Sequence, residues 1–222
     1  MTTVTVEVVK SLLSANDAVA LRNRARLDQA GLLGVNLMSA PGSGKTTLLA
    51  RTMNSLGAAA PCGVLVGDLQ TSRDAERLAD HAAVVHQINT GKGCHLTATQ
   101  VENALGQIAI QGLAFLFIEN VGNMVCPATY ALGERRRVAL LSVTEGDDKV
   151  LKYPTLFQAV DAVLLTKIDL LQVLDFDVQR VEDDLRQLNA HVPLLQLSTR
   201  SGEGFARWLT WLHDMRAEIQ FS

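Results

Sequence analysis

The residues that point most directly to chemistry form a glycine-rich segment, Ser-Ala-Pro-Gly-Ser-Gly-Lys-Thr-Thr, at positions 39–47. An apolar run precedes this segment and a helical pattern follows it, which is typical of a loop that binds phosphate groups. Small residues there allow backbone N–H groups to surround phosphate oxygens, and the helix N-terminus adds a partial positive charge. We expect the Lys45 ammonium to reach the β- and γ-phosphates of a nucleotide and the Thr46 hydroxyl to bind Mg²⁺. The nucleotide-binding residues predicted in this segment are Gly42, Ser43, Gly44, Lys45, Thr46 and Thr47.

Two acidic residues, each directly after an apolar run, extend this predicted site. Asp68 follows one run, and Glu119 follows another and begins the sequence Glu-Asn-Val-Gly that ends at Gly122. The second pattern resembles the acidic-x-x-Gly of GTP-binding proteins, in which the carboxylate acts on Mg²⁺-bound water and the Gly N–H contacts the γ-phosphate. We therefore predict Thr46, Asp68 and Glu119 as Mg²⁺ ligands, and Gly122 as a nucleotide contact. Lys45, Thr46 and Asp68 are the predicted catalytic residues, and the polar loop 68–74 is expected to respond to the γ-phosphate.

A later segment, Thr-Lys-Ile-Asp at 166–169, predicts the identity of the base. It resembles the Asn-Lys-x-Asp motif of GTP-binding proteins, with Thr166 in place of Asn. The carboxylate of Asp169 would accept hydrogen bonds from guanine N1–H and N2–H₂, which adenine does not offer in that arrangement. Lys167 and Asp169 are therefore the predicted guanine-binding pair. Ser198 and Thr199 are similar to the turn that supports the base from behind, and complete the predicted nucleotide site.

Cys94, His95 and Cys126 form a second candidate site, of different chemistry. Cys94 and His95 are adjacent in a glycine-rich turn, and Cys126 follows Gly122 by four residues. Sulfur and nitrogen ligands suit Zn²⁺ or Ni²⁺ better than Mg²⁺. Three ligands do not fill a closed four-ligand structural site, so the fourth position is left to water, a partner or another residue. The third cysteine, Cys62, lies in an apolar run and is interpreted as a small buried side chain.

The composition describes an ordinary globular chain. Its 222 residues are 48% hydrophobic and 19% charged, and the formal net charge is -3. The charge gives no argument for nucleic-acid binding. No apolar run approaches about 18 residues, and the N-terminus does not resemble a secretion signal, so we expect no membrane span and a cytoplasmic location. Three cysteines do not suggest a disulfide framework.

Apolar runs alternate with helical patterns along the chain, which predicts an α/β fold with a doubly wound, mostly parallel sheet of about seven strands. This is the architecture of a P-loop NTPase, and a single domain over 1–222 is expected. The strands are predicted at 32–38, 62–67, 82–88, 113–118, 138–143, 161–165 and 193–197. The helices are predicted at about 16–30, where Asn16 or Asp17 could act as the N-cap, and at 48–56, 73–80, 96–110, 176–188 and 205–219.

Taken together, the motifs resemble the HypB family of hydrogenase nickel-incorporation GTPases, which belongs to the SIMIBI class. The resemblance covers about residues 16–219 and is most specific in the metal-binding segments. The segments that carry it are the phosphate loop, Thr-Gly-Lys-Gly-Cys-His-Leu from residue 90, Ile-Glu-Asn-Val-Gly-Asn-Met-Val-Cys-Pro from 118, Glu-Gly-Asp-Asp-Lys from 145 and Thr-Lys-Ile-Asp-Leu from 166.

The resemblance implies a GTPase that helps to insert nickel into [NiFe]-hydrogenase. Cys94, His95 and Cys126 are then the ligands for Ni²⁺ or Zn²⁺, at or near a homodimer interface. The implied cofactors are GTP or GDP and Mg²⁺, and the implied partners are a HypA-type nickel chaperone and the hydrogenase large subunit. Dimerisation would depend on nucleotide or metal, and the apolar segment 170–174 is either core or part of a dimer surface.

Two other functions fit the same motifs. The protein could be a GTP-dependent regulatory scaffold whose Cys-His site holds structural Zn²⁺. It could also be a related chaperone GTPase for urease nickel or for cobalamin enzymes. Urease accessory GTPases typically carry Cys-Pro-His as their metal motif, whereas here Cys94-His95 and Cys126-Pro127 are separate.

Overall fold

The computed structural model describes residues 2–68, 73–91 and 93–220, and the side chains of 11–68, 73–91 and 93–219. Seven parallel strands form one sheet in the order β3-β2-β4-β1-β5-β6-β7. The prediction of a doubly wound parallel sheet is therefore confirmed. The strands are β1 (Leu33–Ser39), β2 (Cys62–Asp68), β3 (Val84–Asn89), β4 (Phe115–Glu119), β5 (Arg136–Ser142), β6 (Ala162–Thr166) and β7 (Leu194–Leu197).

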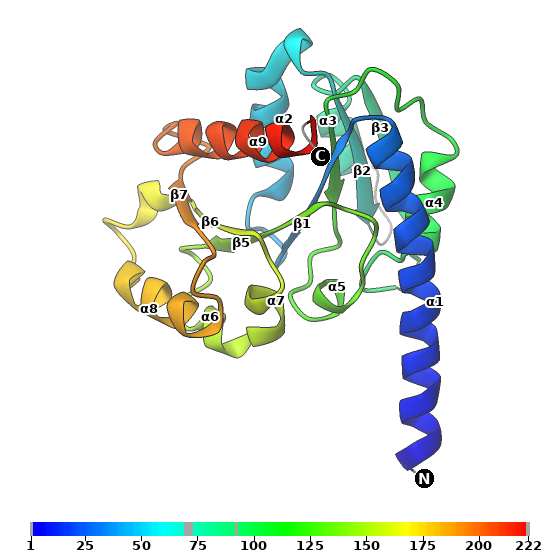
Figure 1. The fold of residues 1–222 in the computed structure, drawn as a ribbon. Helices are drawn as coiled ribbons and strands as arrows, with labels where there is room; N and C mark the ends of the chain where they lie inside the picture. Colours follow the sequence, from blue (N-terminus) through cyan, green and yellow to red (C-terminus); the bar gives the residue numbers. More distant parts are fainter. Residues whose placement is uncertain (1, 69–72, 92, 221–222) are drawn as a thin grey trace.

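Helices cover both faces of the sheet. In Figure 1, α2 and α9 lie on one side, and α5 to α8 lie on the other. Helices α1 and α4 pack against each other beside the half of the sheet that contains β2 and β3. The helices are α1 (Thr2–Gln29), α2 (Lys45–Leu56), α3 (Arg73–Leu78), α4 (Ala98–Leu105), α5 (Cys126–Thr129), α6 (Lys149–Lys152), α7 (Pro154–Gln158), α8 (Val178–Leu188) and α9 (Phe205–Gln220).

The apolar strands are buried on both faces because successive side chains point to opposite sides of the sheet. Phe117 packs with Trp208 of α9 on one side, whereas its neighbour Ile118 packs with Val101 of α4 on the other. The central pairing sets Leu37 of β1 opposite Glu119 of β4. The carboxyl ends of these strands therefore meet at one edge of the sheet, where parallel α/β folds place their ligands.

The N-terminal helix differs from the prediction. It begins at Thr2, not near residue 16, and Figure 1 shows its first half extending beyond the rest of the molecule. Asn16 is not an N-cap, because its side chain donates to the carbonyl of Ala131 at 2.8 Å and accepts from the N–H of Ala98 at 2.9 Å. The segment before it contains no proline or glycine to end the helix.

Several other helix boundaries also differ from the prediction. Helix α4 spans only Ala98–Leu105, because Thr97 forms a capping box with Gln100 at its start and the chain turns at Gly106. Helices α5, α6 and α7 were not predicted, because each is too short to show the repeated spacing of apolar residues that indicates a helix. The predicted loop 68–74 lies mostly outside the described residues.

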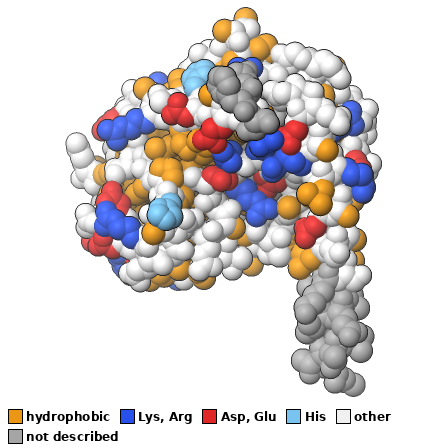
Figure 2. Space-filling model, in the orientation of Figure 1, with side chains coloured by type: hydrophobic (Ala, Val, Ile, Leu, Met, Phe, Trp, Pro, Cys, Tyr) orange, Lys and Arg blue, Asp and Glu red, His pale blue; other side chains and the backbone are white. Residues whose placement is uncertain are grey.

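Basic and acidic side chains are interspersed on the face shown in Figure 2. Three consecutive arginines that lead into and begin β5 each have an acidic partner. The pairs are Arg135 with Asp28, Arg136 with Glu218 and Arg137 with Glu134. No helix in the described part of the chain is both long and apolar enough to cross a membrane.

Candidate functional site

The glycine-rich segment forms a tight loop between β1 and α2. Gly42 and Gly44 have φ angles of 77° and 100°, a left-handed conformation that side chains with a Cβ rarely adopt. Lys45 is 7% exposed, and its ammonium donates to the hydroxyl of Ser39 at 2.8 Å. Ser39, which stands where the usual motif has Gly, thus holds the lysine side chain within the loop. Burial lowers the pKa of Lys45.

Glu119 is buried beside this loop with one oxygen unpaired. Its Oε1 accepts a hydrogen bond of 2.7 Å from the Thr46 hydroxyl, and its Oε2 has no partner among the described residues. Burial raises the pKa of Glu119 to about 7, although the Thr46 hydrogen bond and the charge of Lys45 act in the opposite direction. An acidic group in this setting is poised to gain stabilisation from a cation.

The structure brings most of the predicted phosphate-site residues together around one cavity of about 440 Å³. The predicted residues that line it are Gly42, Gly44, Lys45, Thr46, Thr47, Asp68, Glu119 and Gly122. Ser43 is not among them, but its carbonyl accepts a hydrogen bond of 2.9 Å from Thr166.

The wall of this cavity also contains three polar residues that were not predicted as individual site residues: Asp74, Arg77 and Asn120. Of these, Asp74 lies in the loop 68–74 that was expected to respond to the γ-phosphate. Arg77 of α3 donates to the Thr47 hydroxyl at 3.2 Å and lies 3.6 Å from Asp74. Their place in the sequence could have indicated them, because each follows a strand whose carboxyl end lies beside the phosphate loop.

The predicted base-binding residues form a second cluster, next to the phosphate loop. The Lys167 ammonium donates to the carbonyl of Gly42 at 2.8 Å, so it joins the two clusters. Lys167 itself has a left-handed backbone, with φ 60°. Asp169 accepts a hydrogen bond of 2.6 Å from Ser198, whose hydroxyl also accepts from the N–H of Arg200 at 3.1 Å. The carbonyl of Thr199 is held by a hydrogen bond from Arg51 of α2.

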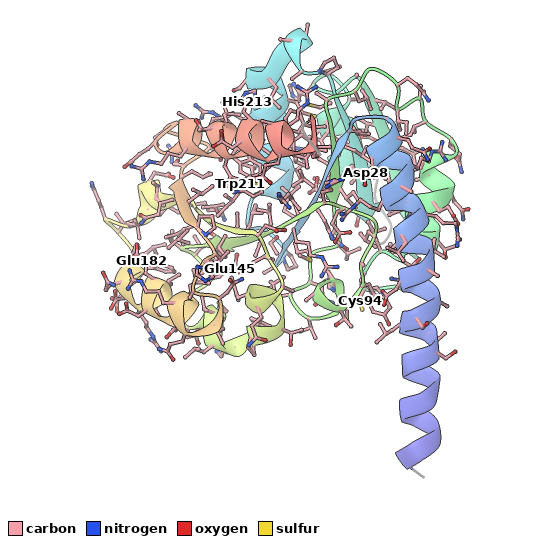
Figure 3. All side chains as sticks on the ribbon, in the orientation of Figure 1. Asp28, Cys94, Glu145, Glu182, Trp211 and His213 are labelled. Carbon is pink, nitrogen blue, oxygen red and sulfur yellow. The ribbon has the colours of Figure 1, made fainter. Side chains whose placement is uncertain are left out.

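The three candidate soft-metal ligands lie together in the folded chain. The ligand atoms of Cys94, His95 and Cys126 are all within 4.8 Å of one another. The two sulfur atoms are 3.1 Å apart, and Cys94 Sγ lies 3.6 Å from His95 Nδ1. In Figure 3, Cys94 lies next to α5, the short helix that begins at Cys126. The segment that contains Cys126 and Pro127 forms the first turn of this helix and is not an irregular loop.

The surroundings of this cluster favour a neutral imidazole and leave one side open. The His95 ring stacks on Tyr130, with the ring centroids 4.1 Å apart. Burial lowers the pKa of His95, and proximity to Cys94 raises the pKa of Cys126. Cys94 is exposed. Cys62, by contrast, is buried in β2, and burial raises the pKa of its thiol to about 12.

Comparisons with known proteins agree with this geometry. The model of the family "CobW/HypB/UreG, nucleotide-binding domain" matches residues 34–196. Hydrogenase maturation factor HypB of Azotobacter chroococcum mcd 1 is 48% identical over 211 residues, which are 95% of this chain and 69% of that protein. Hydrogenase/urease maturation factor HypB of Helicobacter hepaticus is 45% identical, over 96% of this chain and 89% of its own length.

A solved structure gives the same result in three dimensions. The crystal structure of HypB from Helicobacter pylori in complex with nickel superposes with a TM-score of 0.88 and 41% identity, over 92% of this chain and 96% of that chain. The fold is therefore that of a P-loop NTPase, and the expected resemblance is confirmed. This chain belongs to the HypB family of hydrogenase maturation factors.

Proposed function

We propose that this protein is a GTP-hydrolysing metallochaperone that binds nickel and supports its insertion into [NiFe]-hydrogenase. In this proposal, the nucleotide state is coupled to dimerisation and to the release of the metal. The observation that carries the proposal is the position of Cys126, four residues after Gly122, which lines the phosphate cavity. The short segment 122–126 thus contributes to both sites. A movement of its backbone at Gly122 would therefore change the position of Cys126.

The phosphate cavity supports the nucleotide part of the proposal. Lys45 would compensate the charge of the phosphates, and the loop N–H groups would bind their oxygens. Mg²⁺ fits the donor set of Thr46, Asp68 and Glu119, because it prefers oxygen ligands and would satisfy the unpaired Glu119 Oε2. When bound, Mg²⁺ neutralises charge that develops on the phosphate oxygens. Gly122 leaves room for its own N–H to approach the γ-phosphate.

Guanine is the proposed base. The carboxylate of Asp169 would accept from N1–H and N2–H₂ of guanine, while its hydrogen bond from Ser198 fixes its orientation. Lys167 holds the base-binding turn against the phosphate loop through the carbonyl of Gly42. Thr166, which stands where the related motif has Asn, donates a hydrogen bond to the carbonyl of Ser43 and so links the base-binding turn to the phosphate loop.

Nickel is the proposed cargo of the Cys94, His95 and Cys126 cluster. Two sulfur ligands and one imidazole suit Ni²⁺ or Zn²⁺, and an exposed site with three ligands allows the metal to enter and leave. The related HypB of Helicobacter pylori was crystallised in complex with nickel. We propose transfer from a HypA-type chaperone and onward to the hydrogenase large subunit.

The proposed homodimer would form across the edge of the sheet that carries both sites. Val125, Leu151, Val173 and Leu174 are large apolar residues that remain 59%, 49%, 76% and 38% exposed. They lie in segments that follow the carboxyl ends of β4, β5 and β6, which is the edge that carries the phosphate loop. Leu170 and Leu171, in contrast, pack against the core. The segment 170–174 is thus divided between core and surface.

Replacing Glu119 should have opposite effects on the stability of the ligand-free protein and on its Mg²⁺-dependent nucleotide binding. Because its pKa is raised to about 7, the folded protein loses stability as pH rises from about 4.5 to 7. Without nucleotide or metal, Glu119→Gln should be more stable than the wild type at pH 8, by up to roughly 3 kcal/mol, with little difference at pH 4.5. It should also lose Mg²⁺-dependent nucleotide binding.

Urea unfolding in EDTA at both pH values measures the first effect, and calorimetry with GTP and Mg²⁺ measures the second. Glu203→Gln, at an exposed glutamate, is the control and should change neither. A variant equally destabilised at both pH values would contradict the prediction.

Replacing Asp169 should change the preferred base. Asn can donate a hydrogen bond where Asp only accepts, and xanthine presents a carbonyl oxygen where guanine presents its amino group. Asp169→Asn should therefore bind GTP about 100-fold more weakly or worse, and should bind XTP more tightly than the wild type does. Fluorescent-nucleotide competition measures both affinities. The control is Asp175→Asn, at an exposed position nearby, and an unchanged GTP preference in Asp169→Asn would exclude the guanine assignment.

Nickel affinity should depend on both thiols of the cluster and on the nucleotide. Cys94→Ala and Cys126→Ala should each lose more affinity than the roughly 10–100-fold caused by loss of an outer-shell partner. The control is Cys62→Ala, which removes a thiol buried in β2. Ni²⁺ titrations against a chromophoric chelator, with GDP and with a non-hydrolysable GTP analogue, measure both effects. Equal affinity in the two nucleotide states, or Zn²⁺ that is bound tightly and does not exchange, would favour a structural scaffold.

A charge on the proposed dimer surface should weaken dimerisation. Burying one valine side chain stabilises an interface by about 1.5 kcal/mol, so Val173→Asp should raise the dimer dissociation constant about tenfold or more. Light scattering with the GTP analogue and Ni²⁺ measures the oligomeric state. Leu21→Asp, at a 70% exposed leucine on α1, is the control and should dimerise normally. Normal dimerisation of both variants would place the interface elsewhere.

A further inference from the structure

Two asparagines connect the phosphate cavity to the metal-ligand segment, in addition to the chain itself. Asn120 and Asn123 both lie between Glu119 and Cys126, and each bonds across to the segment that contains Cys94 and His95. Hydrogen bonds between groups that are distant in sequence fix the relative positions of two loops. The contacts of the two side chains differ in ways that suggest different roles.

Asn120 serves as a fixed anchor. It is 1% exposed, and its Oδ1 accepts from the N–H of Leu96 at 3.3 Å and from that of Val121 at 3.0 Å. Its Nδ2 donates to Asn36 of β1 at 3.2 Å. Leu96 is itself fully buried and packs so closely on Gly67 that a Cβ there would lie 2.8 Å from its side chain. The residue after His95 is therefore tied to the centre of the sheet.

Asn123 connects the buried end of β1 to two exposed residues, Cys94 and Val125. Its backbone forms an isolated antiparallel bridge with Ser39, whose hydroxyl holds the Lys45 ammonium. Its Nδ2 donates to the carbonyl of Cys94 at 3.3 Å, and its Oδ1 accepts from the N–H of Val125 at 2.8 Å. One half-buried side chain thus contacts the main chain at one cysteine ligand and the turn that precedes the other.

We infer that Asn123 is a positioning residue that transmits the occupancy of the phosphate loop to the metal ligands. When a phosphate binds, it competes with Ser39 for Lys45, and the bridge carries the resulting shift to Asn123. Asn123 then moves the main chain at Cys94, while Asn120 keeps the residue after His95 in place. The spacing of the three ligands changes, and with it the affinity for the metal. This inference rests on the proposed coupling of nucleotide and nickel.

The test measures the ratio of the Ni²⁺ affinities in the two nucleotide states. Replacing a merely structural residue would change both affinities and leave this ratio unchanged. Ni²⁺ affinity is measured with GDP and with the GTP analogue, and nucleotide affinity with and without Ni²⁺. Linkage requires the same ratio from both directions. In the wild type, the ratio should fall within the roughly 5- to 150-fold range of allosteric pairs. In Asn123→Ala, the ratio should approach one, while Ni²⁺ still binds with GDP.

A second variant separates the two hydrogen bonds and guards against misfolding. In Asn123→Ser, the hydroxyl can still accept from the Val125 N–H, as in a serine turn, but it is too short to reach the Cys94 carbonyl. It should fold normally, by circular dichroism and thermal unfolding, and should also lose the coupling. The matched control, Asn103→Ala, changes an exposed asparagine on α4 and should keep the wild-type ratio.

The possible results are distinct. A wild-type ratio of one overturns both the proposed coupling and this inference. A wild-type ratio well above one that persists in Asn123→Ser overturns the inference alone and leaves the proposed function standing. Equal weakening of Ni²⁺ binding in both nucleotide states, with the ratio unchanged, likewise shows that Asn123 is only structural. Loss of the ratio in both Asn123 variants, but not in Asn103→Ala, supports the inference.

Discussion

The pairing of β4 with β1 is the constraint on which both sites depend. It sets Leu37 opposite Glu119, so the phosphate loop and the segment 119–126 leave the sheet side by side. Glu119 is thereby buried against Thr46, where one of its carboxylate oxygens has no partner among the residues that the structure describes and its pKa is raised. The same short segment reaches Cys126 before it becomes helical. The strand register thus places residues of the candidate nucleotide site and of the candidate metal site within the single segment that connects β4 to α5.

The two candidate sites offer different kinds of donor atoms. The phosphate cavity combines a buried ammonium, oxygen donors and backbone N–H groups, which suit phosphate and a hard cation. The cysteine–histidine cluster is more open and has sulfur and nitrogen donors, which suit a softer metal. Because the donor sets differ, Mg²⁺ and nickel would not compete for one place. The two candidate sites therefore offer separate places for a hard and a soft cation.

Sequence patterns correctly predicted the elements that carry a continuous apolar run or a glycine motif. The apolar runs that became β1, β2 and β4 are buried on both faces, and the glycines at 42 and 44 have the backbone that their motif requires. Cys94, His95 and Cys126 were predicted as metal ligands because two of them are adjacent and all three match a family motif, and the structure brings their ligand atoms within 4.8 Å of one another. The predicted start of α1 was wrong, because Asn16 resembled an N-cap, whereas its side chain forms hydrogen bonds with distant main-chain groups.

The contacts of Asn120 and Asn123 could not have been predicted, because side-chain hydrogen bonds between distant residues leave no periodic trace in the sequence. The same reason applies to Asn23, which is 1% exposed and bonds to the carbonyls of Ala98 and Leu132. These asparagines join segments that are distant in the sequence.

The contact between Gly122 and Pro41 has a mechanical consequence. A methyl group added at Gly122 would lie 3.0 Å from the Cα of Pro41, so no gap separates the two loops. Close-packed groups of this kind transmit displacement because there is no empty volume to absorb it. The clearance between the phosphate loop and the start of the segment that leads to Cys126 is therefore smaller than a methyl group. A shift of the phosphate loop toward that segment has to push the segment as well.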